Sequence, residues 1–337
     1  MRASLNPEQL HQLPESPAGP SSAPSLASSS AERLAWLRAR YMKNPRDEMF
    51  EDAMREILES DASGGLSARP QRNGLVNETR GVLVLGAPRI GKTALIRRNL
   101  RHHTAITVTD GKEPGNALYF RVSASPTLKG VATDILRVTG YGQVHARLRS
   151  SQIWDMVVSR LATLGITILW LDEAHHMLEL PKERTDVLRR LKTLMQGDNA
   201  VALIVSGVPG LAEKIQADEE TSERLFRIQL KPMQTERERG EFRSFIGQCC
   251  RLVHLEIPED EYLVERLVSA TNGSLGRAIE CTHSAIGRAL QRKDGHLTLE
   301  DFQRGFALKT GLTGDGPFDP EPWPVLKDIL DRKGWSV

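Results

Sequence analysis

The sequence predicts an α/β protein in which a five-stranded parallel sheet, covered by helices, carries a phosphate-binding loop and is followed by a helical lid domain. Three observations predict this class. Short apolar runs alternate with amphipathic segments over residues 76–234, which is the pattern of a parallel sheet. The stretch GAPRIGKT, residues 86–93, directly follows the first of these runs. After residue 234 the apolar runs stop and only helical periodicity remains.

Length, charge and hydropathy limit the class of protein to which this chain can belong. The chain has 337 residues, enough to bury one large or two modest cores. Because 45 Lys and Arg oppose 43 Asp and Glu, the formal net charge is +2, and any surface for nucleic acid must be a local patch. No apolar run approaches the ~20 residues that span a bilayer, and no signal-peptide core is present. We therefore expect a cytoplasmic protein without membrane contact.

The three cysteines do not indicate a metal site. Cys249, Cys250 and Cys281 lack the spacing of zinc ligands, and adjacent cysteines rarely bridge each other. We expect reduced, buried thiols.

The N-terminal part predicts two kinds of segment before the sheet. Residues 1–30 are rich in Ser, Pro and Ala and are expected to form a disordered leader. Residues 31–75 place apolar side chains at helical spacings that break at Pro45, which predicts two amphipathic helices. The stretch SGGLSARPQRNG then reads as a loop.

The remaining elements follow from periodicity and punctuation. Strands are expected at 81–86, 117–122, 166–172, 201–206 and 227–231. Helices are expected between them near 92–102, 127–139, 150–164, 184–196 and 210–216. The lid domain, 235–310, has helical stretches around 235–252, 259–271, 275–292 and 299–308. Residues 311–337, around Trp323, are expected to form a loosely attached tail.

The loop fits the pattern G-x-x-x-x-G-K-[ST], which binds the phosphates of a nucleotide. Backbone N–H groups surround the β-phosphate at a helix N-terminus, Lys92 reaches the β and γ oxygens, and Thr93 supplies a hydroxyl to Mg²⁺. A glycine turn that binds nothing is the alternative, and the strand before the loop and the helix after it disfavour that alternative. The expected cofactors are ATP and Mg²⁺, and the expected ATP-binding residues are Gly86, Pro88, Gly91, Lys92, Thr93 and Ala94.

An acidic pair ends the third predicted strand. Asp172 is expected to hold Mg²⁺ together with Thr93, and Glu173 is expected to act as general base toward water. Both acids together favour a hydrolase over a protein that only holds nucleotide. The letters DEAH also occur in a large helicase group, but such helicases need a second motor domain, which the helical remainder cannot supply.

Three further polar residues are candidates for sensing or completing the site. Ser206 ends a strand expected to lie between the two motif strands and could report on the γ-phosphate; a plain strand cap is the alternative. Arg224 could reach a neighbouring subunit's nucleotide; a solvated surface arginine is the alternative. Arg277 follows a glycine turn and could fold over the nucleotide as a second sensor.

This arrangement resembles the AAA+ ATPases, and more closely the TniB family of transposition proteins related to the target-selecting ATPase of Tn7-like elements. The resemblance covers roughly residues 31–310. It rests on the stretches ERLAWLRARY, GAPRIGKT, SASPTLKGVATDIL, LGITILWLDEAHHMLE and DEETSERLFRIQLKPM.

The resemblance implies an ATPase that oligomerises on double-stranded DNA, as a ring or helical filament, and recruits or activates a transposase. A target-selection protein is a further implied partner. The resemblance also implies a bacterial protein and assigns Ser206 as first sensor, Arg224 as finger and Arg277 as second sensor. Arg227 is a rival for the finger, because the family's Ser-Arg-Phe pattern is spread out here over residues 222–227. Lys129, Arg147 and Arg149 become the candidate DNA contacts, against the alternative of solvated charges.

Two other interpretations stay open. One is a helicase or initiator loader of the same class, and the other is a structural scaffold that ATP merely assembles. Glu173, as an expected general base, disfavours a scaffold without hydrolysis. His175 and His176 are expected to point apart, so we interpret them as partners of the acidic pair or as switch residues, not as metal ligands.

Overall fold

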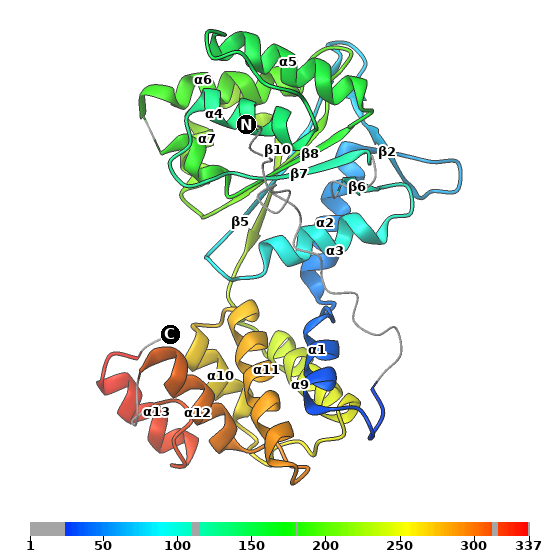
Figure 1. Ribbon diagram of the computed structural model, residues 1–337. Coiled ribbons are helices and arrows are strands. Elements are labelled where there is room, and N and C mark those ends of the chain that lie inside the picture. Colours follow the sequence, from blue (N-terminus) through cyan, green and yellow to red (C-terminus); the bar gives the residue numbers. More distant parts are fainter. Residues whose placement is uncertain (1–23, 110–114, 180, 312–315, 336–337) are drawn as a thin grey trace, which may run out of the picture. The chain divides into compact units, whose positions relative to one another are not determined.

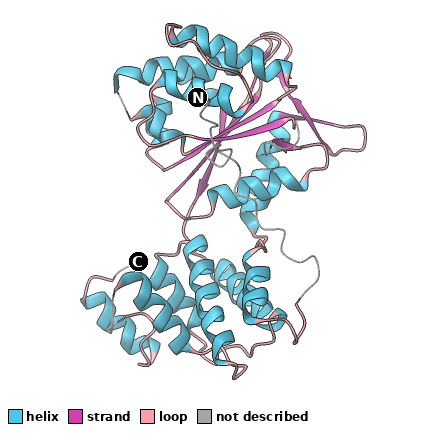
Figure 2. Ribbon diagram, in the orientation of Figure 1, coloured by secondary structure: helices cyan, strands magenta, loops and turns pink. Residues whose placement is uncertain are grey.

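The computed structural model describes residues 24–109, 115–179, 181–311 and 316–335. Most of the expected leader lies outside the described residues. The chain forms two compact units: an α/β unit with Pro45–Ala87 and Lys92–Leu230, and a helical unit with residues 24–44, Pro88–Gly91 and Lys231–Val337. Figure 2 shows that the strands belong to the first unit and that helices alone build the described part of the second.

Six parallel strands form the main sheet, in the order β10–β5–β9–β8–β7–β6. All residues of β5, β8 and β9 are buried, as expected of central parallel strands covered on both faces. The strands are β5 Gly81–Gly86, β6 Val108–Thr109, β7 Ala117–Arg121, β8 Ile168–Asp172, β9 Ala202–Gly207 and β10 Leu225–Leu230.

Helices cover both faces of this sheet (Figure 1). The helices α2 and α3 pack on each other and contact β5 on one face. On the other face, α4 packs against both α5 and α6, over a core to which Leu83, Phe120 and Trp154 belong. The helices of the unit are α2 Pro45–Ile57, α3 Lys92–His102, α4 Leu128–Val138, α5 Ser150–Thr163, α6 Pro181–Leu194, α7 Leu211–Gln216 and α8 Glu219–Glu223.

The α/β fold class is confirmed, but the expected count of five strands is wrong. The sixth strand, β6, has only two residues, too few for an alternating pattern to stand out. The expected loop SGGLSARPQRNG is also wrong in part, because it holds β2 and β3, which pair antiparallel with β1 before it and β4 after it. These strands, Leu58–Ser60, Leu66–Pro70, Arg72–Asn73 and Glu78–Thr79, are short and mostly polar.

In the helical unit, α11 Leu275–Arg292 packs against α1 Ser30–Arg38, α10 Leu263–Thr271 and α12 Leu299–Thr310. Helix α9 Glu236–Leu252 contacts α10. Four of these helices match the stretches expected after residue 234, because their apolar stripes repeat with helical period. Helix α1 begins at a capping box formed by Ser29 and Glu32.

The buried thiols expected from the sequence lie in the helical unit. Cys249, Cys250 and Cys281 are free and buried, and burial raises the pKa of each thiol to about 12. These cysteines therefore pack as small apolar side chains.

The expectation of a loosely attached tail is wrong for its described residues. Phe318 is buried in the core of the helical unit, where it stacks on Phe302 with ring centroids 5.5 Å apart. The guanidinium of Arg266 donates to the carbonyls of Pro317, Asp319 and Glu321. Helix α13, Trp323–Arg332, follows this anchored segment. The prediction of a loose tail rested on the proline and glycine residues of this segment. The contacts that anchor it join distant parts of the chain, so local sequence could not predict them.

Candidate functional site

The carboxyl ends of three neighbouring strands carry the polar residues that the sequence singled out. Strand β9 lies between β5 and β8, as predicted for the strand of Ser206. Strand β5 ends at Gly86, β8 ends at Asp172, and Ser206 lies in register with Val84. Ligands bind at this edge in open parallel sheets.

Asp172 is the centre of the hydrogen bonding at this edge. Its Oδ2 accepts from the Thr93 hydroxyl at 2.9 Å, and its Oδ1 accepts from the Ser206 hydroxyl at 2.6 Å. The backbone N–H of Glu173 also donates to Oδ1, at 3.1 Å. Because Asp172 is only 2% exposed, these donors compensate the burial of its charge.

Two aromatic residues that sequence reasoning missed complete this network. The Tyr119 hydroxyl donates to Asp172 Oδ2 at 3.4 Å, and the Trp170 indole N–H donates to Ser206 Oγ at 2.9 Å. Burial, together with the Asp172 charge, raises the pKa of Tyr119 to about 12, so its proton stays in place. The available signal was a tyrosine in the run ALYFRV, one of the strands expected in the sheet.

The phosphate-loop lysine is buried beside the same edge. Lys92 Nζ donates to the carbonyls of Gly86 at 2.9 Å and Ala87 at 3.2 Å. Burial lowers the pKa of Lys92, while the Glu173 and Asp172 carboxylates oppose that shift. Gly91 has a φ of +110°, which favours glycine at this position of the loop.

These residues fit Mg²⁺ and a nucleoside triphosphate. A hydroxyl and a carboxylate within hydrogen-bonding distance of each other are hard oxygen ligands of the kind Mg²⁺ prefers. Helix α3 begins at Lys92 and has no acidic residue in its first turn, so its N-terminus suits an anion. Lys92 itself is held by carbonyls alone, which phosphate oxygens can replace.

Glu173 lies at the edge of this network. Its backbone is left-handed, with φ of 55°, where the chain turns from β8 into the 3₁₀ helix η2, Ala174–Leu178. Its side chain is 27% exposed and its Oε2 lies 3.4 Å from His175 Nδ1. The carboxylate can therefore meet water while it stays next to Asp172.

The expectation that His175 and His176 point apart is wrong. Their ring centroids lie 4.1 Å apart, and both residues belong to the 3₁₀ helix of residues 174–178. His176 Nδ1 also lies 2.8 Å from Glu179 Oε1. The contact of His175 with Glu173 agrees with its interpretation as a partner of the acidic pair.

The two candidate finger arginines have different surroundings. Arg224 is 8% exposed, and its Nη2 donates to Glu78 Oε1 and Glu220 Oε1, both at 2.7 Å. Arg227 is exposed and donates to Ser222 Oγ. The exposed arginine of this segment is thus Arg227, although the sequence pattern put Arg224 first.

The candidate DNA residues lie in one part of the α/β unit. Lys129, in the first turn of α4, donates to the carbonyls of Ala146 at 2.7 Å and Leu148 at 2.8 Å. These two hydrogen bonds hold the segment that carries Arg147 and Arg149, and both arginines are exposed. In the helical unit, Arg277 is exposed in the first turn of α11, and its role as second sensor stays a prediction.

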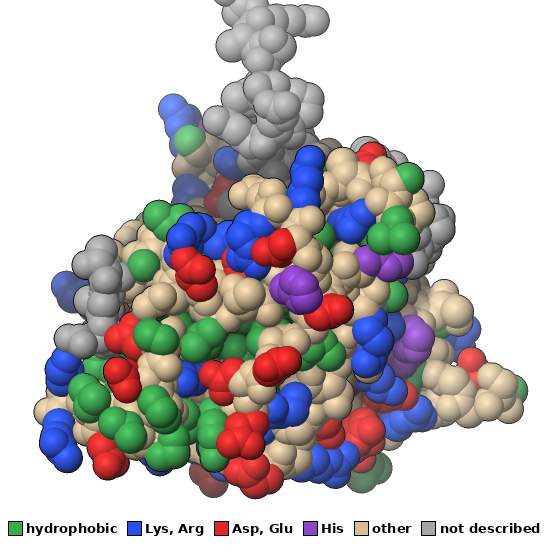
Figure 3. Space-filling view, turned by 90° about the horizontal axis from the view of Figure 1, so that it is seen from below, with side chains coloured by type: hydrophobic (Ala, Val, Ile, Leu, Met, Phe, Trp, Pro, Cys, Tyr) green, Lys and Arg blue, Asp and Glu red, His purple; other side chains and the backbone are tan. Residues whose placement is uncertain are grey.

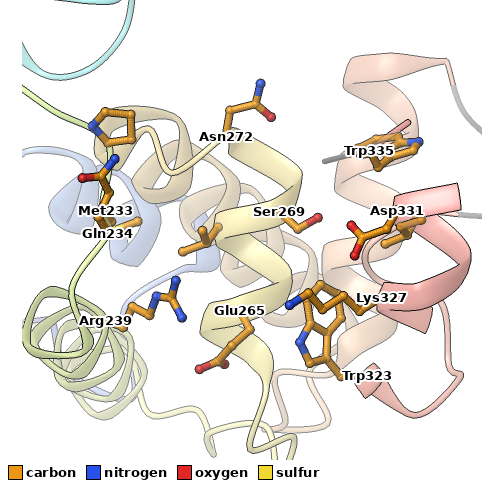
Figure 4. A pocket seen from close by; sticks show the side chains of 13 residues that line it. Met233, Gln234, Arg239, Glu265, Ser269, Asn272, Trp323, Lys327, Asp331 and Trp335 are labelled. Carbon is orange, nitrogen blue, oxygen red and sulfur yellow. The ribbon is translucent and has the colours of Figure 1, made fainter. Parts of the chain in front are cut away.

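The helical unit has a separate cavity of about 720 Å³ beside α10 and α13. Figure 4 shows the indoles of Trp323 and Trp335 and the side chains of Arg239 and Lys327 around it. Trp323 is only 8% exposed, so the tail holds this side chain inward. The cavity brings together none of the residues expected to bind nucleotide.

Fold and strand-edge geometry together define the class as an AAA+ ATPase fold. Three solved structures share it, each under 20% identical. Cdc6p of Pyrobaculum aerophilum has a TM-score of 0.53 at 16% identity, over 88% of this chain and 70% of that one. ORC1 of Aeropyrum pernix, in complex with DNA, has a TM-score of 0.52 at 17% identity, over 76% and 78%. ORC2 of the same organism has a TM-score of 0.52 at 17% identity, over 78% and 67%.

The amino-acid sequence, in contrast to the fold, identifies the family of this chain. The family described as Bacterial TniB protein matches residues 38–235, more than half of the chain, and the chain belongs to this family. Curated protein sequences give no significant match. Within the described residues, no helix combines the length and apolar character needed to cross a membrane.

Proposed function

We propose that this chain is an ATP-hydrolysing regulator of DNA transposition that assembles on duplex DNA and recruits or activates a transposase. One observation carries the hydrolytic part. Asp172 accepts hydrogen bonds from the hydroxyls of Thr93 and Ser206, and the next residue, Glu173, has a partly exposed carboxylate. A protein that only held nucleotide would need no such base.

Each residue of the strand edge has a role in this proposal. Bound Mg²⁺ supplies charge neutralisation to the terminal phosphates of ATP. Thr93 and Asp172 would hold the ion, and the Lys92 ammonium, which donates to the carbonyls of Gly86 and Ala87, would donate to phosphate oxygens instead. Glu173 accepts a proton from water on a carboxylate oxygen. Ser206, bonded to Asp172, couples the ion site to β9 as first sensor.

We assign the finger role to Arg227 in preference to Arg224. A finger must leave its own subunit, and Arg224 would give up two carboxylate partners to do so. Removing a buried guanidinium from such partners costs several kcal/mol. Arg227 is exposed on β10 and meets no such cost. The second sensor, Arg277, remains part of the proposal.

We place the DNA contact on Arg147 and Arg149, with Lys129 fastening their segment. Figure 3 shows Lys and Arg interspersed with Asp and Glu over the visible face, in keeping with the net charge of +2. DNA binding must therefore depend on local contacts to phosphates. Two exposed arginines two residues apart, on a segment held by Lys129, meet that need.

The family favours transposition over the loading of a helicase. The likeness to Cdc6p and the ORC proteins concerns the fold alone, whereas the TniB match follows the sequence over residues 38–235. The scaffold interpretation leaves Glu173 without a role. A transposase and a target-selection protein are the proposed partners.

The DNA contact can be tested by fluorescence anisotropy with two unrelated duplexes, over a range of salt, with a non-hydrolysable ATP analogue. We expect the double variant Arg147→Ala/Arg149→Ala to weaken binding to both duplexes alike and to lower the salt slope by about two. Arg189→Ala, an exposed arginine of α6, is the matched control. Unchanged affinity and slope in the double variant would contradict the proposed contact.

A further inference from the structure

The 3₁₀ helix after the acidic pair, with the residue that ends it, brings together three side chains of the types that bind metals. One ligand atom from each of His175, His176 and Glu179 lies within 4.8 Å of the others. None of the three belongs to the proposed Mg²⁺ site, which uses Thr93 and Asp172. We propose that they form a second cation site, selective for Zn²⁺-like transition metals.

The local backbone explains why these residues meet. In a 3₁₀ helix, side chains three residues apart lie above one another. His176 and Glu179 are three apart, and His176 Nδ1 reaches Glu179 Oε1 at 2.8 Å. The His175 ring lies against the His176 ring, with centroids 4.1 Å apart.

The donor set suits Zn²⁺ more than Mg²⁺. Two imidazoles and one carboxylate are the ligands of many zinc sites, whereas Mg²⁺ prefers oxygen alone. Tetrahedral bonds of about 2.0–2.1 Å place ligand atoms about 3.3 Å apart, so the 4.8 Å cluster needs only modest side-chain rotation. Three protein ligands leave a fourth position for water.

Two observations beyond proximity support a site. His175 Nδ1 is buried without a hydrogen-bond partner within the described residues, although Glu173 Oε2 lies 3.4 Å away. The side chains of His175, His176 and Glu179 are 14%, 24% and 44% exposed, so an ion can reach them from solvent.

The consequence for hydrolysis rests on the proposed function. Because His175 contacts the carboxylate proposed as general base, an ion bound to His175 changes the surroundings of Glu173. Zn²⁺ should then lower ATP hydrolysis in the native chain.

Titration calorimetry tests the site. Zn²⁺ is titrated into the nucleotide-free protein, and the buffer contains excess Mg²⁺ throughout so that the Mg²⁺ site is saturated. We expect one Zn²⁺ per chain, with affinity reduced at least about tenfold in His176→Asn and in Glu179→Gln. Co²⁺ should give the visible spectrum of a tetrahedral site in the native chain. The control is His102→Asn/His103→Asn, an adjacent pair whose ring centroids lie 6.4 Å apart, which should bind as the native chain does.

The outcomes separate the inference from the proposed function. Because Glu179 is partly exposed, Glu179→Gln should fold normally, and circular dichroism checks this. Absent binding, or binding unchanged in both ligand variants, would overturn the site whatever the ATPase does. Specific binding by a chain without ATPase activity would keep the site and overturn only the proposed hydrolysis.

Discussion

At the scale of single residues, Asp172 organises the strand edge through the hydrogen bonds that it accepts. It is buried, yet it accepts hydrogen bonds from Thr93, Ser206, Tyr119 and the Glu173 backbone. A buried carboxylate with several donors is held in one orientation. The neighbouring Glu173 side chain has no such set of donors and stays available to water.

The first residue-scale prediction concerns Glu173. Replacement by Gln keeps the size of the side chain but removes the proposed base, so we expect hydrolysis to fall at least about a hundredfold while ATP binding is retained. Phosphate release and nucleotide binding measured on one preparation check this. Glu213→Gln, at an exposed position of α7, is the control. Native-like hydrolysis by Glu173→Gln would favour the scaffold interpretation.

The second prediction separates the two arginines. Arg224→Ala leaves Glu78 and Glu220 without their shared partner, so we expect the free energy of unfolding to fall by about 2 kcal/mol. Arg227→Ala should change it by at most about 0.5 kcal/mol, yet lower DNA-stimulated hydrolysis at least about a hundredfold. Urea denaturation and phosphate release measure the two effects. A stable Arg224→Ala that loses stimulated hydrolysis would make Arg224 the finger.

Residue spacing predicted the loop and the acidic pair because both are local along the chain. The pattern from Gly86 to Thr93 and the pair at 172–173 need no tertiary information. The bonds of Tyr119 and Trp170 and the burial of Arg224 could not be predicted, since each depends on side chains brought together by the sheet.

At the scale of elements, helix α11 buries a histidine that makes the helical unit sensitive to acid. Burial, followed by the nearby Arg38 charge, lowers the pKa of His283 to about 4, with Glu280 opposing the shift. The folded state therefore favours the neutral ring. Its contribution to stability is full above the unfolded pKa of about 6.5 and is lost as the pH falls from there toward 4.

The measurable consequence is a loss of about 2 kcal/mol from His283 between pH 7.5 and pH 5. We expect His283→Leu to remove most of this pH dependence, as measured by urea unfolding at both values. His145→Gln, at an exposed position, should leave it unchanged. An equal pH dependence in His283→Leu and the native chain would contradict the assignment.

A second element-scale prediction concerns the C-terminal segment. Arg266 is 3% exposed, pairs with Asp260 at 2.7 Å and donates to three carbonyls of residues 317–321. Arg266→Met should destabilise the helical unit by about 3 kcal/mol and speed hydrogen exchange in residues 316–332. Arg243→Met, which removes a half-exposed arginine of α9, should cost less than about 1 kcal/mol. Unchanged exchange in Arg266→Met would show that Phe318 alone anchors the segment.

The sequence predicted long helices and strongly apolar strands well, and it missed short strands. The long helices α9 and α11 and the apolar strands β5, β8 and β9 have clear periodicity or continuous apolar runs. Strand β6 and the two short hairpins give no such signal. The anchored tail was missed because its contacts lie about fifty residues apart along the chain.

At the scale of the whole molecule, the chain combines an AAA+ fold with the sequence of a TniB protein, and both support one proposed function. Nucleotide state is proposed to decide whether subunits stay together on DNA. The near balance of 45 basic against 43 acidic residues makes nonspecific attraction weak, so assembly must add the contacts of many subunits.

Sedimentation of the purified chain with duplex DNA, in turn with ATP, a non-hydrolysable analogue and ADP, tests this central claim most directly. We predict large DNA-bound assemblies with the analogue, smaller or transient ones with ATP, and free protein with ADP. With Glu173→Gln, ATP should act like the analogue. A chain that binds nucleotide but sediments identically with and without DNA in all three states would contradict the claim.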